Sequence, residues 1–246
     1  RLYAGRCLIE TEQFDKARHH FRNLLADKGD IGAQANLWHA RSDSRRGRYD
    51  EAAAHLAKVV DQYQRSAHAS DLDFDFANAL MSGKRTDWKQ ATKYFDRIER
   101  RGHDKFAQMP SVLSQAAVCY HQEQDYRRSL DANRRFLSRF ADDALAGDVR
   151  FMQAENLFML GKPDEANIAY GEFLAHHEDH RNTSAGVFRR AQILHDQGRW
   201  QASLDAAGPL VEQKPTGLLY EQLAFMVGDS HFRLDQWRES IEPLEN

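Results

Sequence analysis

Pairs of small residues, twelve positions apart, recur along the whole chain with a period of about 37 residues. The first member of each pair is Gly or Ala, and the second is Ala or Ser. The seven pairs are Gly5 with Ala17, Ala40 with Ala52, Ala79 with Ala91, Ala117 with Ser129, Ala154 with Ala166, Ala191 with Ser203 and Gly228 with Ser240. A fixed period of this length is typical of a stacked repeat protein, in which each unit packs only against its neighbours.

The fifth repeat shows why one period predicts two helices. Phe151, Ala154, Leu157 and Phe158 are spaced as one apolar stripe of a helix. Gly161 can adopt the left-handed conformation that ends a helix, and the next residues open a second one, beginning at a proline. In the other six repeats, an aromatic residue takes the place of this proline, three positions before the second small residue. The pattern predicts an all-α fold of antiparallel helix pairs.

We expect a single solenoid over residues 1–246. Both ends interrupt a repeat and lack the polar outer face of a terminal repeat, so we expect the chain to be a segment of a longer protein. The expected repeats cover approximately residues 1–30, 31–69, 70–107, 108–144, 145–181, 182–217 and 218–246.

Composition disfavours several classes of partner. The formal net charge of −3 argues against nucleic-acid binding, and no apolar run is long enough for a membrane span. Cys7 and Cys119 occupy the same position in repeats that are three apart. Helix layers stack roughly 8–10 Å apart. Three repeats therefore separate the two cysteines by more than a disulfide can span. We expect both cysteines to be free, partly buried thiols.

No catalytic motif stands out in the sequence. It contains no GxSxG, no phosphate-binding Gly-rich loop, no CxxC and no HExxH. The best metal candidate is the pair His176 and His180, one helical turn apart. This pair falls at the frayed end of a helix and no fourth ligand is indicated. We therefore expect no enzyme activity, no cofactor and no metal.

The arrangement resembles the tetratricopeptide repeat family over essentially the whole chain. The resemblance rests on the small residue in each first helix, the turn glycines Gly47, Gly161 and Gly198, the aromatic residue at the turn, and the small residue opening each second helix. It implies a right-handed superhelical solenoid of antiparallel helix pairs. The period exceeds the family's usual length of about 34 residues.

The resemblance also implies a binding groove along the concave face, lined by the first helices. Its residues lie fifteen, eleven and eight positions before each second small residue. In the first two repeats these positions select a basic set, with Arg45 one turn further along: Arg6, Leu37, Arg41 and Arg45. In the last three repeats they select an aromatic and acidic set: Phe151, Glu155, Phe158, Phe188, Gln192, His195, Phe225, Asp229 and Phe232.

Two interpretations stay open for each set. The phenylalanines that come first in their repeats either pack between adjacent first helices, which we favour, or form an exposed ladder for a peptide with apolar anchors. The basic residues Arg41, Arg45, Arg46 and Arg48 either form a solvated turn, which we favour, or clamp a carboxylate.

The expected function is a non-catalytic scaffold that holds a protein or peptide partner along the concave face. One alternative is the accessory helical region of a larger enzyme, such as a cell-wall lytic enzyme. Another is a structural subunit whose open ends stack on copies of itself. The ends of the second helices, at residues 136–143 and 173–180, resemble those of bacterial envelope repeat proteins, which favours a periplasmic location without deciding the compartment.

Overall fold

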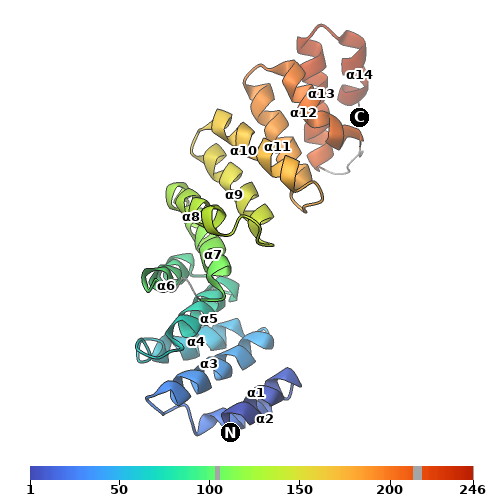
Figure 1. Cartoon of the computed structure of the whole chain (residues 1–246). Helices are drawn as coiled ribbons and strands as arrows, with labels where there is room; N and C mark the ends of the chain where they lie inside the picture. The colour runs from blue at the N-terminus through green and yellow to red at the C-terminus, as the bar shows by residue number, and fades with distance from the viewer. Residues whose placement is uncertain (103–105, 213–217, 246) are drawn as a thin grey trace. The chain divides into compact units, whose positions relative to one another are not determined.

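The computed structural model describes residues 1–102, 106–212 and 218–245, and within them it contains helices and no strands (Figure 1). The predicted all-α fold is confirmed. The helices are α1 (Leu2–Glu10), α2 (Phe14–Arg22), α3 (Asp30–Arg45), α4 (Tyr49–Val59), α5 (Ala69–Ser82), α6 (Trp88–Arg100), α7 (Met109–Gln122), α8 (Tyr126–Arg139), α9 (Ala146–Met159), α10 (Pro163–His176), α11 (Thr183–Asp196), α12 (Trp200–Glu212), α13 (Leu218–Arg233) and α14 (Trp237–Glu245).

The helices fall into two compact units. The first unit, residues 1–125, contains α1 to α7, and the second unit, residues 126–246, contains α8 to α14. Within each unit, every helix packs against the helices that follow and precede it in the sequence. No helix among the described residues is long and apolar enough to cross a membrane.

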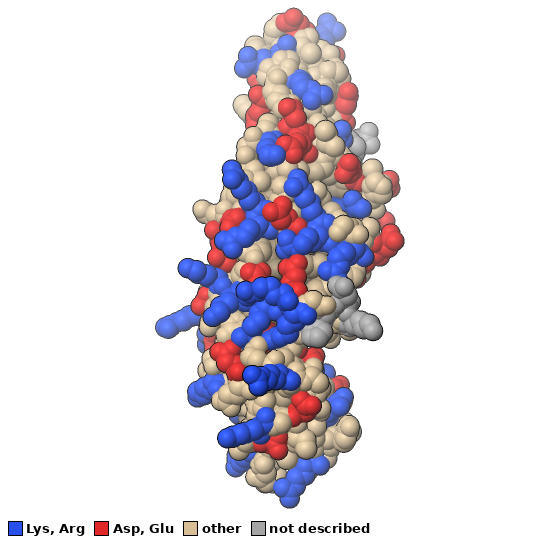
Figure 2. Space-filling model, turned by 60° about the vertical axis from the view of Figure 1, so that its left-hand side comes forward, with Lys and Arg blue, Asp and Glu red and all other residues tan. Residues whose placement is uncertain are grey.

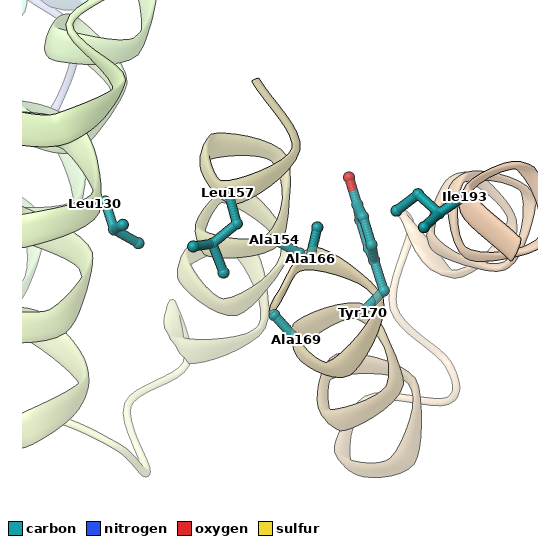
Figure 3. Packing of buried hydrophobic residues seen from close by; sticks show 7 residues of the cluster. All are labelled: Leu130, Ala154, Leu157, Ala166, Ala169, Tyr170 and Ile193. Atoms are coloured by element: carbon teal, nitrogen blue, oxygen red, sulfur yellow. The ribbon is translucent and has the colours of Figure 1, made fainter. Parts of the chain in front are cut away.

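The paired small residues are buried, as close helix packing requires. Ala154 of α9 and Ala166 of α10 are both fully buried in one cluster with Tyr170 (Figure 3). Leu130 of the preceding helix and Ile193 of the next repeat join the same cluster. This cluster therefore joins side chains from three successive repeats.

In six of the seven repeats, the turn between the two helices contains one left-handed residue, five positions before the second small residue. Gly47, Gly161 and Gly198 have φ angles of 72°, 70° and 70° there, as the sequence predicts. In the first, fourth and seventh repeats the same position is Glu12, Gln124 or Asp235, with φ angles of 58°, 61° and 60°. The turn geometry therefore persists where glycine is missing.

The two cysteines are unpaired, as expected, but differ in burial. Cys7 is exposed and Cys119 is buried, so the expectation of partial burial is wrong for both. Burial raises the pKa of the Cys119 thiol to about 12.

Candidate partner-binding surface

The basic residues predicted for the first unit are engaged by neighbouring repeats. Arg45 of α3 donates from its two terminal nitrogens to the carboxylate of Glu10 in α1, at 3.1 and 3.0 Å. Arg41 donates from Nε to Asp75 Oδ2 in α5 at 2.6 Å. The Arg6 guanidinium lies 4.7 Å from the centre of the Trp38 ring. The carboxylates that a partner would need to supply to Arg41 and Arg45 are already present within the chain.

Leu37 does not belong to an accessible surface. Its exposed fraction is 2%, and Phe76, the equivalent residue of the third repeat, is 1% exposed. This first groove position faces the interior of the first unit, so we correct the assignment of Leu37 and place it in the core.

The equivalent phenylalanines of the second unit become more open along the chain. Phe151 is half-buried, and its ring centre lies 5.5 Å from that of Phe173 in α10. Phe158 packs against the same core cluster and lies 4.7 Å beneath the Arg189 guanidinium. Phe225 of α13 is 63% exposed. Packing thus accounts for the two phenylalanines of the fifth repeat, whereas the exposed aromatic surface lies nearer the C-terminus, at Phe225.

Glu155 has partners inside the solenoid. It accepts a hydrogen bond from the hydroxyl of Tyr170 and a longer one, at 3.4 Å, from Arg189 Nε in the next repeat. Burial, followed by the negative charge of Glu155, raises the pKa of Tyr170. Glu155 therefore joins two repeats and is not a free acid of the groove.

A groove between α11 and α13 brings four of the predicted residues together. Its volume is about 440 Å³. The lining residues are Phe188, Arg189, Gln192, His195 and Asp196 from α11, with Gln222, Phe225 and Met226 from α13.

Polar contacts fix the groove walls. His195 Nε2 lies 3.0 Å from Asp229 Oδ2, and its ring meets the edge of Trp200 with 5.0 Å between ring centres. Arg189 donates from Nη1 to Gln192 Oε1 at 2.9 Å. These contacts hold polar side chains at the sides of an apolar surface.

The remaining two predicted residues lie beside the groove rather than in its lining. Asp229 bridges His195 and Arg233, whose Nε is 3.4 Å from Asp229 Oδ1. Phe232 is 50% exposed and contacts Trp237, with 4.9 Å between ring centres.

Sequence reasoning missed four of the residues that line the groove. Arg189 and Met226 each follow a predicted phenylalanine directly, while Gln222 and Asp196 precede or follow a predicted residue within one turn. The prediction used three fixed positions in each first helix, which follow a narrow line along that helix. The surface between two helices also includes residues next to those positions in the sequence.

The histidines of the metal candidate are used in packing. His176 Nδ1 lies 2.8 Å from the Glu172 carbonyl oxygen, and the His177 ring stacks on Phe173. His180 Nε2 lies 3.3 Å from Asp148 Oδ1. In the part of the chain that the structure describes, no three His, Cys, Asp or Glu side chains are grouped to hold a metal ion.

The helix pairs, the buried small residues and the groove between first helices define a helical repeat protein. A model of the tetratricopeptide repeat family matches residues 4–67 and 151–216, more than half of the chain. The chain therefore belongs to the tetratricopeptide repeat family. No curated protein sequence matches it.

Solved structures with the same fold share little sequence with this chain. MamA of strain AMB-1 is 19% identical with a TM-score of 0.60, over 77% of this chain and 96% of that one. YrrB, described as a TPR protein with an unusual peptide-binding site, is 18% identical with a TM-score of 0.58, over 77% and 89%. A tetratricopeptide repeat protein of Parabacteroides merdae ATCC 43184 is 10% identical with a TM-score of 0.60, over 99% and 89%. These likenesses show the fold alone.

Proposed function

We propose that this protein is a non-catalytic scaffold that binds a protein or peptide partner in the groove between α11 and α13. The observation that carries the proposal is the open apolar surface of Phe225, which faces the same 440 Å³ groove as Phe188. Exposed aromatic rings in a groove between helices suit an extended or helical segment with apolar anchors.

The sides of the groove carry polar side chains, which favour a partner segment with polar residues beside its apolar ones. Gln192, Gln222 and His195 offer hydrogen-bonding groups, while Arg189 and Asp196 carry opposite charges. The preferred segment therefore has one or two large apolar side chains flanked by polar residues, rather than a run of one charge. The Asp229 carboxylate holds the His195 ring, which keeps this wall in place without the partner.

The test uses Phe188→Ala and Phe225→Ala in the full chain, with Phe232→Ala as the matched control. Phe232 is a similarly exposed aromatic residue outside the groove lining. The partner is first isolated by affinity capture on the wild-type chain and then titrated by calorimetry. Each groove variant should weaken binding by about tenfold or more, as for buried aromatic anchors, whereas the control should change it less than about twofold. Equal effects of all three, with helical circular dichroism unchanged, would remove the groove assignment.

Self-association through α13 and α14 is the second candidate function. Phe232, Trp237 and Ile241 expose 50%, 53% and 52% of their surface on this helix pair. Exposed apolar residues gathered on one helix pair favour contact with another protein surface. Light scattering across a concentration series should show a rising mass that Trp237→Ser and Ile241→Ser suppress; a constant monomer mass would exclude this candidate.

A further inference from the structure

The first helix of the second unit, α8, is strongly basic, although the unit as a whole carries a negative net charge. Residues 126–246 hold 14 Lys and Arg against 19 Asp and Glu, a net charge of −5. Helix α8 nevertheless holds one acid, Asp131, and five exposed arginines: Arg127, Arg128, Arg134, Arg135 and Arg139. Figure 2 shows many Lys and Arg side chains, in blue, on the face that it turns forward.

The start of α8 is an unfavourable place for these charges. Its first turn contains no acidic residue, and Arg127 and Arg128 lie beside the positive end of the helix dipole. The first turn of α10 carries Asp164 and Glu165, the favourable choice. Helix stability therefore does not explain the arginines at this position.

Three other repeats, the first, second and fifth, place a carboxylate where α8 has Arg127. This position is the second residue of the second helix, and its carboxylate accepts a hydrogen bond from the turn of the next repeat. Asp15 accepts from Arg46 Nη1 at 3.0 Å, Asp50 from the Lys84 backbone N–H at 3.2 Å, and Asp164 from Gln197 Nε2 at 2.9 Å. Each contact joins adjacent repeats at their edge.

Between α8 and the next repeat this contact cannot form. Arg127 replaces the carboxylate, and Leu160 stands at the turn position of the donors Arg46 and Gln197. A pocket of about 380 Å³ lies there instead. Its lining consists of Arg127, Leu130, Asp131, Arg134, Leu160 and Lys162.

The pocket combines an apolar floor with a cationic rim. Leu130 belongs to the buried cluster of Figure 3, and Leu160 packs against that cluster. Arg127 has no hydrogen-bond or ion-pair partner among the described residues. Arg134 has only a distant, exposed contact with Asp131 at 3.7 Å, and Lys162 contacts the exposed Glu165 at 2.8 Å. Three cations thus face one acid in the lining.

We propose that this pocket binds a short acidic peptide segment with one apolar side chain. A carboxylate of the segment contacts Arg127, with Arg134 and Lys162 beside it. The apolar side chain rests on Leu130 and Leu160. The pocket shares no residue with the α11–α13 groove, so it is a second binding site on the scaffold.

A peptide fits these observations better than a nucleic acid. The lining has no aromatic side chain on which a base could stack, and it contains Asp131. The net charge of −5 on residues 126–246 repels a long polyanion, whereas a short acidic segment contacts only the local cations.

The experiment measures fluorescence anisotropy of a fluorescein-labelled peptide, Asp-Asp-Leu-Glu-Asp-Asp, titrated with the full chain. Arg127→Glu should weaken binding by about tenfold or more because it inserts a like charge, and Arg127→Gln by less. Replacing the peptide leucine by serine should also weaken binding. The matched control is Arg238→Glu, an exposed arginine at the same repeat position in α14, which should leave affinity unchanged.

Three results would overturn the proposal: no effect of Arg127→Glu, an equal effect of Arg238→Glu, or tighter binding of a single-stranded oligonucleotide than of the peptide. Arg127→Gln provides the readout should the charge reversal disturb helical circular dichroism. The pocket shares no residue with the groove between α11 and α13, so failure of this test leaves the proposed function of that groove standing.

Discussion

At the residue scale, six of the seven repeats require a left-handed residue five positions before the second small residue. Glycine there is visible in three repeats, but Glu12, Gln124 and Asp235 adopt the same left-handed conformation. A residue with a Cβ atom is strained there by roughly 1–2 kcal/mol, which the surrounding helix pair must offset. The sequence marks the turn only where glycine reduces this strain.

Glycine should therefore stabilise the turns that lack it. We expect Glu12→Gly and Gln124→Gly each to raise the free energy of unfolding by about 1 kcal/mol, because relief of strain exceeds the entropy lost by glycine. Gly161→Ala should lower it by a similar amount. Urea denaturation checks all three, and a destabilising effect of both glycine substitutions would contradict the strain argument.

The two thiols should react very differently with a thiol reagent at pH 8. Cys7 is exposed, while Cys119 is buried with its pKa raised to about 12, so Cys119 stays protonated and inaccessible. Ellman's reagent should modify one thiol rapidly in the folded chain and two in urea. Rapid reaction persisting in Cys7→Ser would show that Cys119 is accessible.

At the element scale, a buried carboxylate joins helices through ion pairs that the sequence repeat does not predict. Asp73 of α5 is fully buried and accepts hydrogen bonds from Arg97, with its Oδ2 also 2.6 Å from Arg101 Nη1. We expect Asp73→Asn to lower the free energy of unfolding by about 3 kcal/mol because two cations lose their carboxylate. Asp61→Asn, an exposed partner of Arg97, is the control and should cost less than about 1 kcal/mol. Comparable losses in the two variants would show that burial of Asp73 is unimportant.

A histidine pair should make the first unit sensitive to acid. The rings of His39 in α3 and His55 in α4 lie 4.4 Å apart, and burial lowers the pKa of each from 6.5 to about 4. Their neutral forms are therefore favoured by folding. The stability involved is present above pH 6.5 and lost as pH falls towards 4, because the unfolded chain binds the protons first.

The test compares thermal unfolding at pH 7 and pH 4.5 for the wild type and for His39→Gln with His55→Gln. The melting temperature of the wild type should fall more between these pH values than that of the double variant. The control is the double variant His19→Gln with His20→Gln in α2. Its melting temperature should fall between the two pH values by as much as that of the wild type. Parallel falls in all three proteins would exclude the buried pair as the cause.

The candidate site was only partly predictable from sequence. Repetition of the small pairs identified the helix pairs and placed Phe188, Gln192, His195 and Phe225 on one surface, which the structure joins in a groove. The partners of Arg41 and Arg45, by contrast, lie 34 and 35 residues away. The residue pattern within one repeat cannot show which side chains of an adjacent repeat will contact its residues.

At the scale of the whole molecule, the two units allow stability to vary along the chain. In a repeat protein, loss of one contact chiefly weakens its own repeat and the adjoining ones. We expect Asp73→Asn to increase hydrogen exchange of α5 and α6 while that of α11 and α12 stays unchanged. Exchange that rises equally in both units would indicate one cooperative structure instead.

The spacing of the polar contacts between repeats has a consequence for the history of such a chain. Arg41 with Asp75, Arg189 with Glu155 and His195 with Asp229 all join residues 34 positions apart, so each repeat recognises only its neighbour. Duplication or loss of a whole period recreates a junction of the same general form, whereas a change of a few residues breaks the register. Length is then a heritable quantity that changes in steps of one period, and new binding surfaces can arise by adding repeats without redesigning the old ones.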